Sequence, residues 1–422
     1  MTWILGVAVG LILIVIFVLF QVAMPKFTIL QTLIDRLNLV SREILTGIPV
    51  IRAFSREKHE EDRFEKANLD LTKTNLFVNR CMTFMMPIMM LIMNGVSVLI
   101  IYSGAHAVDN GTMQVGNVMA FIQYAMQIIM SFLMITAMSI MLPRANVAAL
   151  RIDEVLKTEV SIQDPETPVH PSESVKGEIE FDHVSFAYPE AGENVLTDIS
   201  FKAKKGQTIA VIGSTGSGKS TLINLIPRYY DVTKGSVKVD GVDVRDMTQK
   251  ELRDKLGYVP QKGVLFSGTI DSNIRYGKPE ITDAQVKEAA EVAQATEFID
   301  TKPEKYESPV SQGGTNVSGG QKQRLSIARA IAKDPEIFIF DDSFSALDFK
   351  TDSQLRKALK EYTKDATTVI VAQRISTILG ADQIIVLDDG HMAGIGTHKE
   401  LMANCEVYQQ IARSQLSEEE LA

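Results

Sequence analysis

The chain has 422 residues, enough for two or three domains of ordinary size, and a net charge of −9. Its 45% share of hydrophobic residues excludes intrinsic disorder, and the acidic balance argues against nucleic acid as a partner. Two cysteines, Cys81 and Cys405, cannot build a disulfide framework. The charges are spread unevenly, because residues 1–150 hold only 20 of them and 18 of those lie between Lys26 and Arg80. This distribution excludes a single soluble domain.

Three long stretches contain no Asp, Glu, Lys or Arg: residues 1–25, 81–108 and 110–143. A hydrocarbon core about 30 Å thick needs about 20 apolar residues of helix, so we predict three transmembrane helices. A secretory signal is the alternative for the first stretch, but no basic residue precedes Lys26 and the stretch is too long. The turn-forming sequence Asp109-Asn110-Gly111 is predicted to join the second and third helices.

The connector between the first two spans, residues 26–80, carries 10 Lys and Arg residues, whereas the turn at 109–113 carries none. The positive-inside rule therefore places the connector and everything after Arg144 in the cytosol. We predict a multi-pass protein of the cell membrane with a cytoplasmic C-terminal half.

Within the connector, residues 26–46 and 50–80 have helical spacing, and Gly47-Ile48-Pro49 is predicted to break the helix between them. The elbow around this break, Thr46–Phe54, carries apolar side chains where solvent would be expected: Ile48, Ile51 and Phe54. Such a tip predicts docking on another domain.

The membrane half is rich in methionine, with 13 of the 18 methionines between Met82 and Met141. These side chains either pack between helices and lipid or form an adaptable apolar binding surface. Three polar residues in the spans either join helices by hydrogen bonds or line a substrate cavity: Asn94, Gln123 and Gln127. Because no ionisable Asp, Glu, Lys or Arg lies mid-span, ion-coupled transport is disfavoured and the energy source is expected in the soluble half.

Three prolines among polar residues mark a predicted linker at 153–177. We therefore expect a membrane domain at 1–152, a second domain at 178–412 and an acidic tail at 413–422, whose Glu418-Glu419-Glu420 is interpreted as a solvated helix end.

In the second domain, a buried strand predicted at Thr208–Ile212 runs into a glycine-rich loop, followed by an apolar helical pattern. The loop is Gly213-Ser214-Thr215-Gly216-Ser217-Gly218-Lys219-Ser220-Thr221. In this strand–loop–helix context the glycines let backbone N–H groups surround phosphates, Lys219 reaches the β- and γ-phosphates, and Ser220 ligates Mg²⁺. The loop alone also fits a kinase, a GTPase or a helicase.

A second buried strand, Ile337–Phe340, ends at Asp341-Asp342, and Asp341 fits the carboxylate that holds Mg²⁺. Shortly before this strand comes Ser318-Gly319-Gly320-Gln321. This serine–glycine–glycine–glutamine sequence is the signature of ATP-binding cassette (ABC) ATPases. The chain as a whole resembles a multidrug-type ABC half-exporter, which implies ATP and Mg²⁺ as cofactors and a small amphiphilic substrate.

The resemblance implies roles for further residues. Tyr188 is similar to the aromatic residue that stacks on adenine, Gln261 to the Q-loop residue that links Mg²⁺ to the membrane domain, and Ser345-Ala346-Leu347-Asp348 to the D-loop. Residues 43–66 resemble the second intracellular loop, so Ile48, Ile51 and Phe54 would belong to its coupling helix.

The resemblance also implies the fold class: a helical membrane domain whose three transmembrane helices have long cytosolic extensions, and an α/β P-loop nucleotide-binding domain. The latter would include an antiparallel β subdomain and a helical signature subdomain. The family's membrane domain has six helices, and those seen here resemble helices four to six, so we expect an N-terminally incomplete membrane domain.

Two positions depart from the family's pattern. Where the family has a catalytic glutamate and a switch histidine, this chain has Asp342 and Gln373. Aspartate is one methylene shorter, and misplacement by about 1 Å can cost ~100-fold in rate. Glutamine is neutral and cannot pass a proton as histidine does.

The signature and the D-loop, which the resemblance assigns to a partner's ATP site, are intact. The two altered positions belong to the chain's own ATP site. This pattern is similar to the degenerate-site subunit of a heterodimeric ABC exporter. The alternatives are an ordinary homodimer with tolerated variants, a regulatory ATP-binding subunit that hydrolyses almost nothing, and an exporter of lipids or peptides. The three spans disfavour a cytosolic cassette ATPase without transport.

Overall fold

The computed structural model describes residues 2–189 and 191–416. The predicted acidic residues Glu418-Glu419-Glu420 lie outside this part of the chain. The structure divides into two compact units, Met1–Glu159 and Val160–Ala422.

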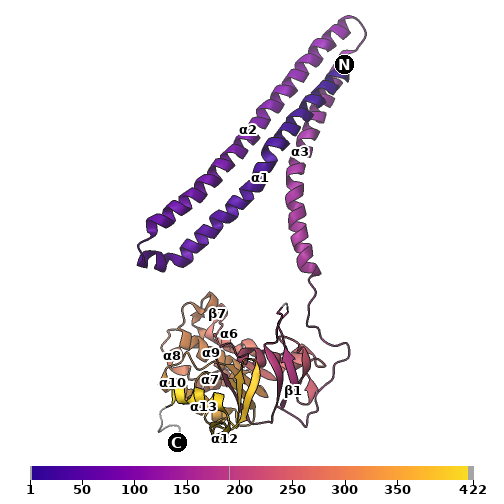
Figure 1. The fold of residues 1–422 in the computed structure, drawn as a ribbon. Coiled ribbons are helices and arrows are strands. Elements are labelled where there is room, and N and C mark those ends of the chain that lie inside the picture. Colours follow the sequence, from indigo (N-terminus) through magenta and orange to yellow (C-terminus); the bar gives the residue numbers. More distant parts are fainter. Residues whose placement is uncertain (1, 190, 417–422) are drawn as a thin grey trace. The chain divides into compact units, whose positions relative to one another are not determined.

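The first unit consists of three long helices: α1 (Thr2–Ala53), α2 (Glu57–Asp109) and α3 (Val115–Lys157). Each contains a stretch long and apolar enough to cross a membrane, in agreement with the three predicted spans. The helices α1 and α2 run side by side in opposite directions (Figure 1), and the ion pair between Arg63 and Glu43 links them. The ammonium group of Lys26 also lies 6.0 Å from the ring centre of Phe77.

The predicted helix break at Gly47-Ile48-Pro49 is wrong, because α1 continues through these residues to Ala53. Pro49 has no N–H group to donate to the carbonyl group of Leu45, so one helical hydrogen bond is lost. Because Pro49 and Leu45 are both exposed, water can bind this carbonyl group instead. The helix ends where Ser55 adopts a left-handed φ of 51°. There Arg56 donates its N–H to Ile51 O and Ser55 donates to Arg52 O, a Schellman motif.

The predicted turn at Asp109-Asn110-Gly111 is confirmed. Gly111 has a φ of 67°, and the same motif ends α2, since Thr112 donates its N–H to Ala107 O and Gly111 donates to Val108 O. Helix α3 continues to Lys157, so the extended segment that follows it begins after residue 153, where the predicted linker starts.

The three helices pack through two small apolar clusters at the N-terminal end of α1. One contains Ile4, Val96 and Ala125, and the other contains Ile12 and Ile129 together with Met89. Elsewhere these helices expose many large apolar side chains, as expected of surfaces that face lipid or further helices.

The second unit is built on a six-stranded sheet with the order β12-β11-β3-β10-β9-β6, parallel except for β12. Its strands are β3 (Thr208–Gly213), β6 (Leu256–Val259), β9 (Ile337–Asp341), β10 (Thr367–Val371), β11 (Gln383–Asp388) and β12 (His391–Gly396). A four-stranded antiparallel sheet comprises β1 (Ile179–Phe186), β2 (Leu196–Ala203), β4 (Lys234–Val239) and β5 (Val242–Asp243). A short pair comprises β7 (Gly268–Thr269) and β8 (Pro309–Val310).

The helices of this unit are α4 (Lys219–Leu225), α5 (Gln249–Asp254), α6 (Ile270–Ile274), α7 (Asp283–Val292), α8 (Thr296–Asp300), α9 (Gly319–Ala332), α10 (Phe349–Tyr362), α11 (Ile375–Ile378), α12 (His398–Asn404) and α13 (Glu406–Gln415). Single 3₁₀ turns occur at Arg275–Gly277, Lys305–Glu307 and Gln312–Gly314.

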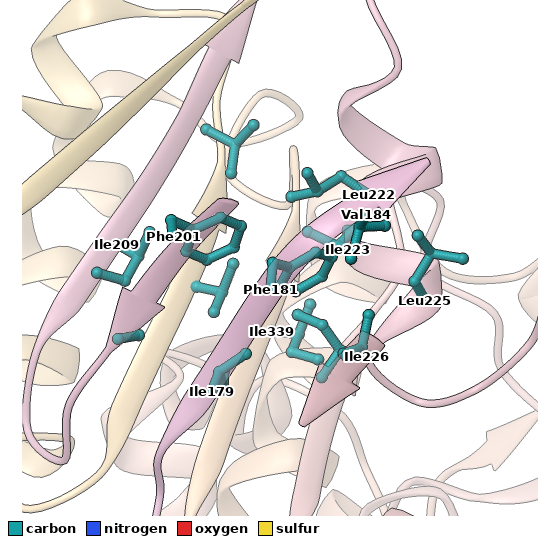
Figure 2. Close-up of a cluster of buried hydrophobic side chains, with 14 of the residues drawn as sticks. Ile179, Phe181, Val184, Phe201, Ile209, Leu222, Ile223, Leu225, Ile226 and Ile339 are labelled. Atoms are coloured by element: carbon teal, nitrogen blue, oxygen red, sulfur yellow. The ribbon is translucent and has the colours of Figure 1, made fainter. Parts of the chain in front are cut away.

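Helix α4 is fixed by the core that joins the two larger sheets. Figure 2 shows Leu222, Ile223 and Leu225 of α4 beside Phe181 of the antiparallel sheet and Ile339 of the parallel sheet. Because these side chains are almost fully buried, the start of α4 is held rigidly against the end of β3.

Candidate functional site

Four neighbouring parallel strands end at the same edge of the sheet, and each is followed by a residue singled out from the sequence. The glycine-rich loop follows β3, Gln373 follows β10, Asp341-Asp342 ends β9, and Gln261 follows β6. Ligands of open α/β sheets bind outside the carboxyl ends of the strands. The topology therefore brings together four motifs that are spread over 160 positions of the sequence.

The loop between β3 and α4 needs glycine for steric reasons. Gly216 and Gly218 have φ values of 88° and 95°, which L-residues with a side chain rarely adopt. At Gly213, a Cβ atom would lie 2.1 Å from Leu387 O. The loop can therefore fold closely over the sheet edge while residues 214–216 stay exposed to a ligand.

Lys219 begins α4 and turns its ammonium group back over the loop, donating to Gly213 O at 3.0 Å and to Ser214 O at 2.6 Å. Burial lowers the pKa of Lys219, against the opposing effect of Asp342 and Asp341. A polyanion would compensate this desolvated cation, and the N-terminus of α4 favours the same charge.

The hydroxyl group of Ser220 donates to Asp341 Oδ1 at 3.0 Å, so two hard oxygen ligands lie side by side. Burial raises the pKa of Asp341, with a smaller contribution from Asp342. Within the described residues no group of three or more His, Cys, Asp or Glu could hold a metal ion. The oxygen pair of Ser220 and Asp341 fits Mg²⁺, which typically takes one or two protein ligands and fills its sphere with phosphate oxygens and water.

Tyr188 lies beside this loop, with its hydroxyl group 2.9 Å from Thr221 Oγ1. Its ring packs edge-on against Phe186 and Tyr230, at centroid distances of 4.9 and 5.1 Å. These contacts hold a half-buried aromatic ring at the mouth of the loop, where it can stack on a planar base.

Asp342 is held by the two glutamines that flank it. Gln373 Nε2 donates to Asp342 Oδ2 at 2.7 Å, and Gln261 Nε2 donates to the same oxygen at 3.3 Å. The residue has a left-handed φ of 45° and is 8% exposed, and burial raises the pKa of its carboxyl group. One oxygen of the carboxylate is thus already occupied by two amide donors.

A residue that the sequence did not reveal fixes the switch position. Gln415, the last residue of α13, donates Nε2–H to Gln373 O and accepts the N–H of Ile375 with Oε1, both at 2.8 Å. No motif marks Gln415, which lies 42 residues after Gln373. It clamps the backbone on either side of Arg374.

The signature residues form the N-terminus of α9. Ser318 is the N-cap, its Oγ accepts the N–H of Gln321 at 3.3 Å, and Gln321 Oε1 accepts the N–H of Ser318 at 3.2 Å. Ser318 and Gly319 are exposed and Gly320 is partly buried. The capping box presents a preformed, uncovered helix N-terminus, which suits an anion.

The D-loop connects the Asp342 region to α10. Ser345 Oγ donates to Asp342 O at 2.9 Å, and Asp348 caps α10 by accepting the N–H of Thr351 at 3.0 Å. Hydrogen bonds from Thr351 lower the pKa of Asp348.

The remaining predicted site residues lie in the first unit. Ile48 and Ile51 occupy the last turns of α1, and Phe54 in the following turn is 73% exposed. Gln123 and Gln127 are exposed on α3, on the face opposite buried Ala125 and Ile129, and Asn94 is exposed on α2.

Two family descriptions match this chain: "ABC transporter transmembrane region" over residues 1–132 and "ABC transporter" over residues 196–345. An uncharacterized ABC transporter ATP-binding protein of Mycobacterium tuberculosis is 44% identical over 98% of this chain and 72% of its own length. The chain belongs to the ABC transporter family.

Two further similarities concern export. A candidate multidrug export ATP-binding/permease protein of Bacillus subtilis is 39% identical over 85% of this chain and 62% of its own length. The solved structure of a bacterial Atm1-family ABC exporter with ATP bound is 28% identical, with a TM-score of 0.81 over 98% of this chain and 72% of that one.

These findings establish an ABC exporter half-transporter that combines a transmembrane region with an ATP-binding domain. The predicted fold class is confirmed, and so are the assignments as an ATPase coupled to transport and as a multi-pass membrane protein with a cytoplasmic nucleotide-binding domain.

Proposed function

We propose that this chain is one subunit of a heterodimeric exporter of amphiphilic or hydrophobic compounds, and that its own ATP site hydrolyses weakly. The observation that carries the proposal is the pairing of Asp342 with Gln373 at 2.7 Å beside an intact signature helix. The proposed substrate class rests on the apolar, methionine-rich helices α2 and α3, with Asn94, Gln123 and Gln127 as polar contacts of a substrate cavity.

At its own site, the chain would bind ATP with groups that are already positioned. The backbone N–H groups of the loop and Lys219 would hold the phosphates, and Tyr188 would stack on the base. The Mg²⁺ would be held by Ser220, Asp341 and Gln261, and when bound it neutralises phosphate charge. Hydrolysis also needs a carboxylate that orients water. Asp342 is short for this task, and two amides already hold one of its oxygens.

At the partner's site, the same chain would act through Ser318, Gly319, Gly320 and Gln321. The exposed N-terminus of α9 supplies N–H groups and a helix dipole to the γ-phosphate held by the partner's loop. Ser345 and Asp348 of the D-loop would complete that surface. In this arrangement most turnover occurs at the partner's site, and this subunit retains ATP.

The tip of the α1–α2 hairpin would couple hydrolysis to transport. At this tip, Val50 is 61% exposed and Phe54 is 73% exposed. This is a large exposed apolar surface for a segment that lies outside the predicted spans. The nucleotide-binding unit of this chain has an exposed apolar surface near Gln261, formed by Val264 and the stacked rings of Phe266 and Tyr276, which would receive the partner's hairpin. We propose that Ile48, Ile51 and Phe54 of this chain contact the nucleotide-binding domain of the partner.

The test is reconstitution of the full chain with its partner half-transporter in vesicles, followed by ATP-dependent movement of a fluorescent amphiphilic dye. We expect export, and we expect Ile51→Asp/Phe54→Asp to abolish it while ATP binding persists. Leu69→Asp, at an exposed apolar position of α2 away from the tip, should retain export. ATP binding without any export by the native pair would favour the regulatory subunit instead.

A further inference from the structure

A cavity of about 350 Å³ lies in the nucleotide-binding unit away from the phosphate-binding loop. Its floor is formed by neighbouring strands in register, with Ala210 beside Ile370 and Ile370 beside Phe340. Its walls are α10 and residues 376–381. Ile370 lies in a central strand yet is only partly buried, so the sheet is incompletely covered at this point.

The lining of this cavity is apolar inside and basic at the rim. Phe340, Phe344, Leu359 and Ile378 contribute apolar surface, whereas α10 contributes three cations: Arg356, Lys357 and Lys360. No acidic side chain is among the described residues that line it. The volume lies within the range of about 300–1,000 Å³ that is usual for pockets of small organic ligands.

Two buried polar atoms in this lining have no hydrogen-bond partner in the described part of the chain. One is Thr368 Oγ1, in a residue that is 5% exposed, and the other is Arg356 Nε. The other guanidinium nitrogens of Arg356 bind Ser376 O and Asp352 Oδ2, each at 2.8 Å. Both atoms are covered by neighbouring protein atoms, so they contribute no hydrogen bonds to a ligand in the cavity.

The cavity shares a wall with the ATP site. A smaller cavity of about 210 Å³ is lined by Asp342 and Gln373, and Phe344 and Thr377 line both cavities. Phe344 follows Asp342 by two residues, and Thr377 follows Gln373 by four. A molecule in the larger cavity therefore contacts the two segments that carry the altered catalytic positions.

We propose that this cavity binds an amphipathic organic anion, an aromatic acid, and that its occupancy is coupled to the ATP site through Phe344 and Thr377. The aromatic body would cover Ile370 and Phe340, and the acid group would pair with the basic rim of α10. The proposal goes beyond the function proposed above and holds at whatever rate the Asp342 site hydrolyses ATP.

The probe we choose is 4-benzoylbenzoate, which combines a carboxylate, an aromatic body and a photoreactive ketone. The full transporter in nanodiscs of neutral phosphatidylcholine is irradiated with increasing probe, and labelled peptides are mapped by mass spectrometry. We expect saturable labelling within the nucleotide-binding unit to be confined to residues 208–210 and 340–381. Labelling of α1–α3 should rise without saturation and provides an internal reference for partition into the membrane.

The variant Lys357→Glu/Lys360→Glu reverses two exposed rim charges and should reduce the saturable labelling about tenfold. The matched control Lys204→Glu/Lys364→Glu reverses two exposed charges of the same unit outside the lining and should leave labelling unchanged. Labelling of residues 208–210 and 340–381 that does not saturate, or that resists the rim variant, overturns the binding site.

Coupling is tested in the same samples by adding ATP and Mg²⁺. If the two cavities are coupled, ATP must shift the half-saturating probe concentration, and the probe must shift ATP affinity by the same factor. We expect a shift of about threefold or more in each measurement. If labelling saturates but the half-saturating probe concentration is the same with and without ATP, the proposed coupling is overturned and the proposed binding site stands.

Discussion

The signature helix and the switch region of the nucleotide-binding unit use their polar groups in different ways. At the start of α9, Ser318 and Gln321 bond to each other, which leaves the surrounding backbone N–H groups exposed for an external anion. At the end of β9, Asp342 is buried and bonded to two amides. The first surface leaves donors free for an external anion, whereas the second bonds its polar groups to one another.

If this site hydrolyses weakly, as we propose, it is nevertheless an ordered site. Gln373 donates to Asp342, and Gln415 holds the backbone of Gln373, so the altered residues form a connected hydrogen-bond network. Such a network rigidifies a site. Rigidity is compatible with tight retention of ATP and opposes the motion of a water-activating carboxylate.

Loss of ATP from the site formed by the glycine-rich loop should produce the largest change. Lys219→Ala removes the cation that faces the phosphates, and we expect ATP retained at this site to fall by about 100-fold in affinity. Filter retention of radiolabelled ATP on the assembled transporter measures this. Lys205→Ala, an exposed lysine before β3, is the control and should retain ATP. Equal retention in Lys219→Ala would contradict the assigned phosphate contact.

Restoration of the family's residues should partly erase the contrast between the two surfaces. Asp342→Glu/Gln373→His lengthens the carboxylate and supplies a titratable imidazole, so turnover at this site should rise about tenfold. It is measured as steady-state ATPase with the partner's site blocked by Ser318→Arg. Asp342→Glu alone should give a smaller gain. No gain from the double change would contradict the role that we propose for these two positions.

The clamp on the switch backbone should have a moderate effect. Gln415→Leu removes two hydrogen bonds, each worth about 1 kcal/mol, and frees the backbone of Gln373. We expect the dissociation rate of retained ATP to rise about threefold. The control Gln409→Leu, also in α13, removes a hydrogen bond to Met402 O of α12, and the dissociation rate should stay at the native value.

The smallest effect concerns stability without nucleotide. Burial raises the pKa of Asp342, so its charged form costs stability at neutral pH, and this cost fades as pH falls through the folded-state pKa. Asp342→Asn should therefore raise Tm by about 2 °C at pH 7, with a difference that shrinks toward about pH 4. Asp348 has a lowered pKa, so its charge stabilises at neutral pH, and Asp348→Ala should lower Tm. Thermal scans across pH check both signs.

The sequence predicted those parts of the structure that local patterns determine. The strand–loop–helix around Gly213–Thr221 and the strand before Asp341 follow from short runs of residues, and the turn at Gly111 follows from glycine's access to positive φ. The break at Gly47-Ile48-Pro49 was wrong because one proline in an exposed helix costs only one hydrogen bond.

Long-range polar contacts escaped prediction. Gln415 has no sequence signal, since an amide in a polar helix is common and its partner lies 42 residues away. The hydrogen bonds from Gln261 and Gln373 to one oxygen of Asp342 likewise form only because the strand order brings these three residues together. Sequence can identify the types of residues in this site, whereas the geometry that holds Asp342 requires the folded chain.

The most direct test of the asymmetry is the steady-state ATPase activity of the assembled transporter with Ser318→Arg and with Asp342→Asn in this subunit. An arginine at Ser318 would fill the place of the partner-held γ-phosphate, so activity should fall by about 100-fold. Asp342→Asn should cost less than about twofold, because its site contributes little turnover. An Asp342→Asn variant as inactive as Ser318→Arg, or brisk hydrolysis by this chain alone as a homodimer, would contradict the assignment of a degenerate site.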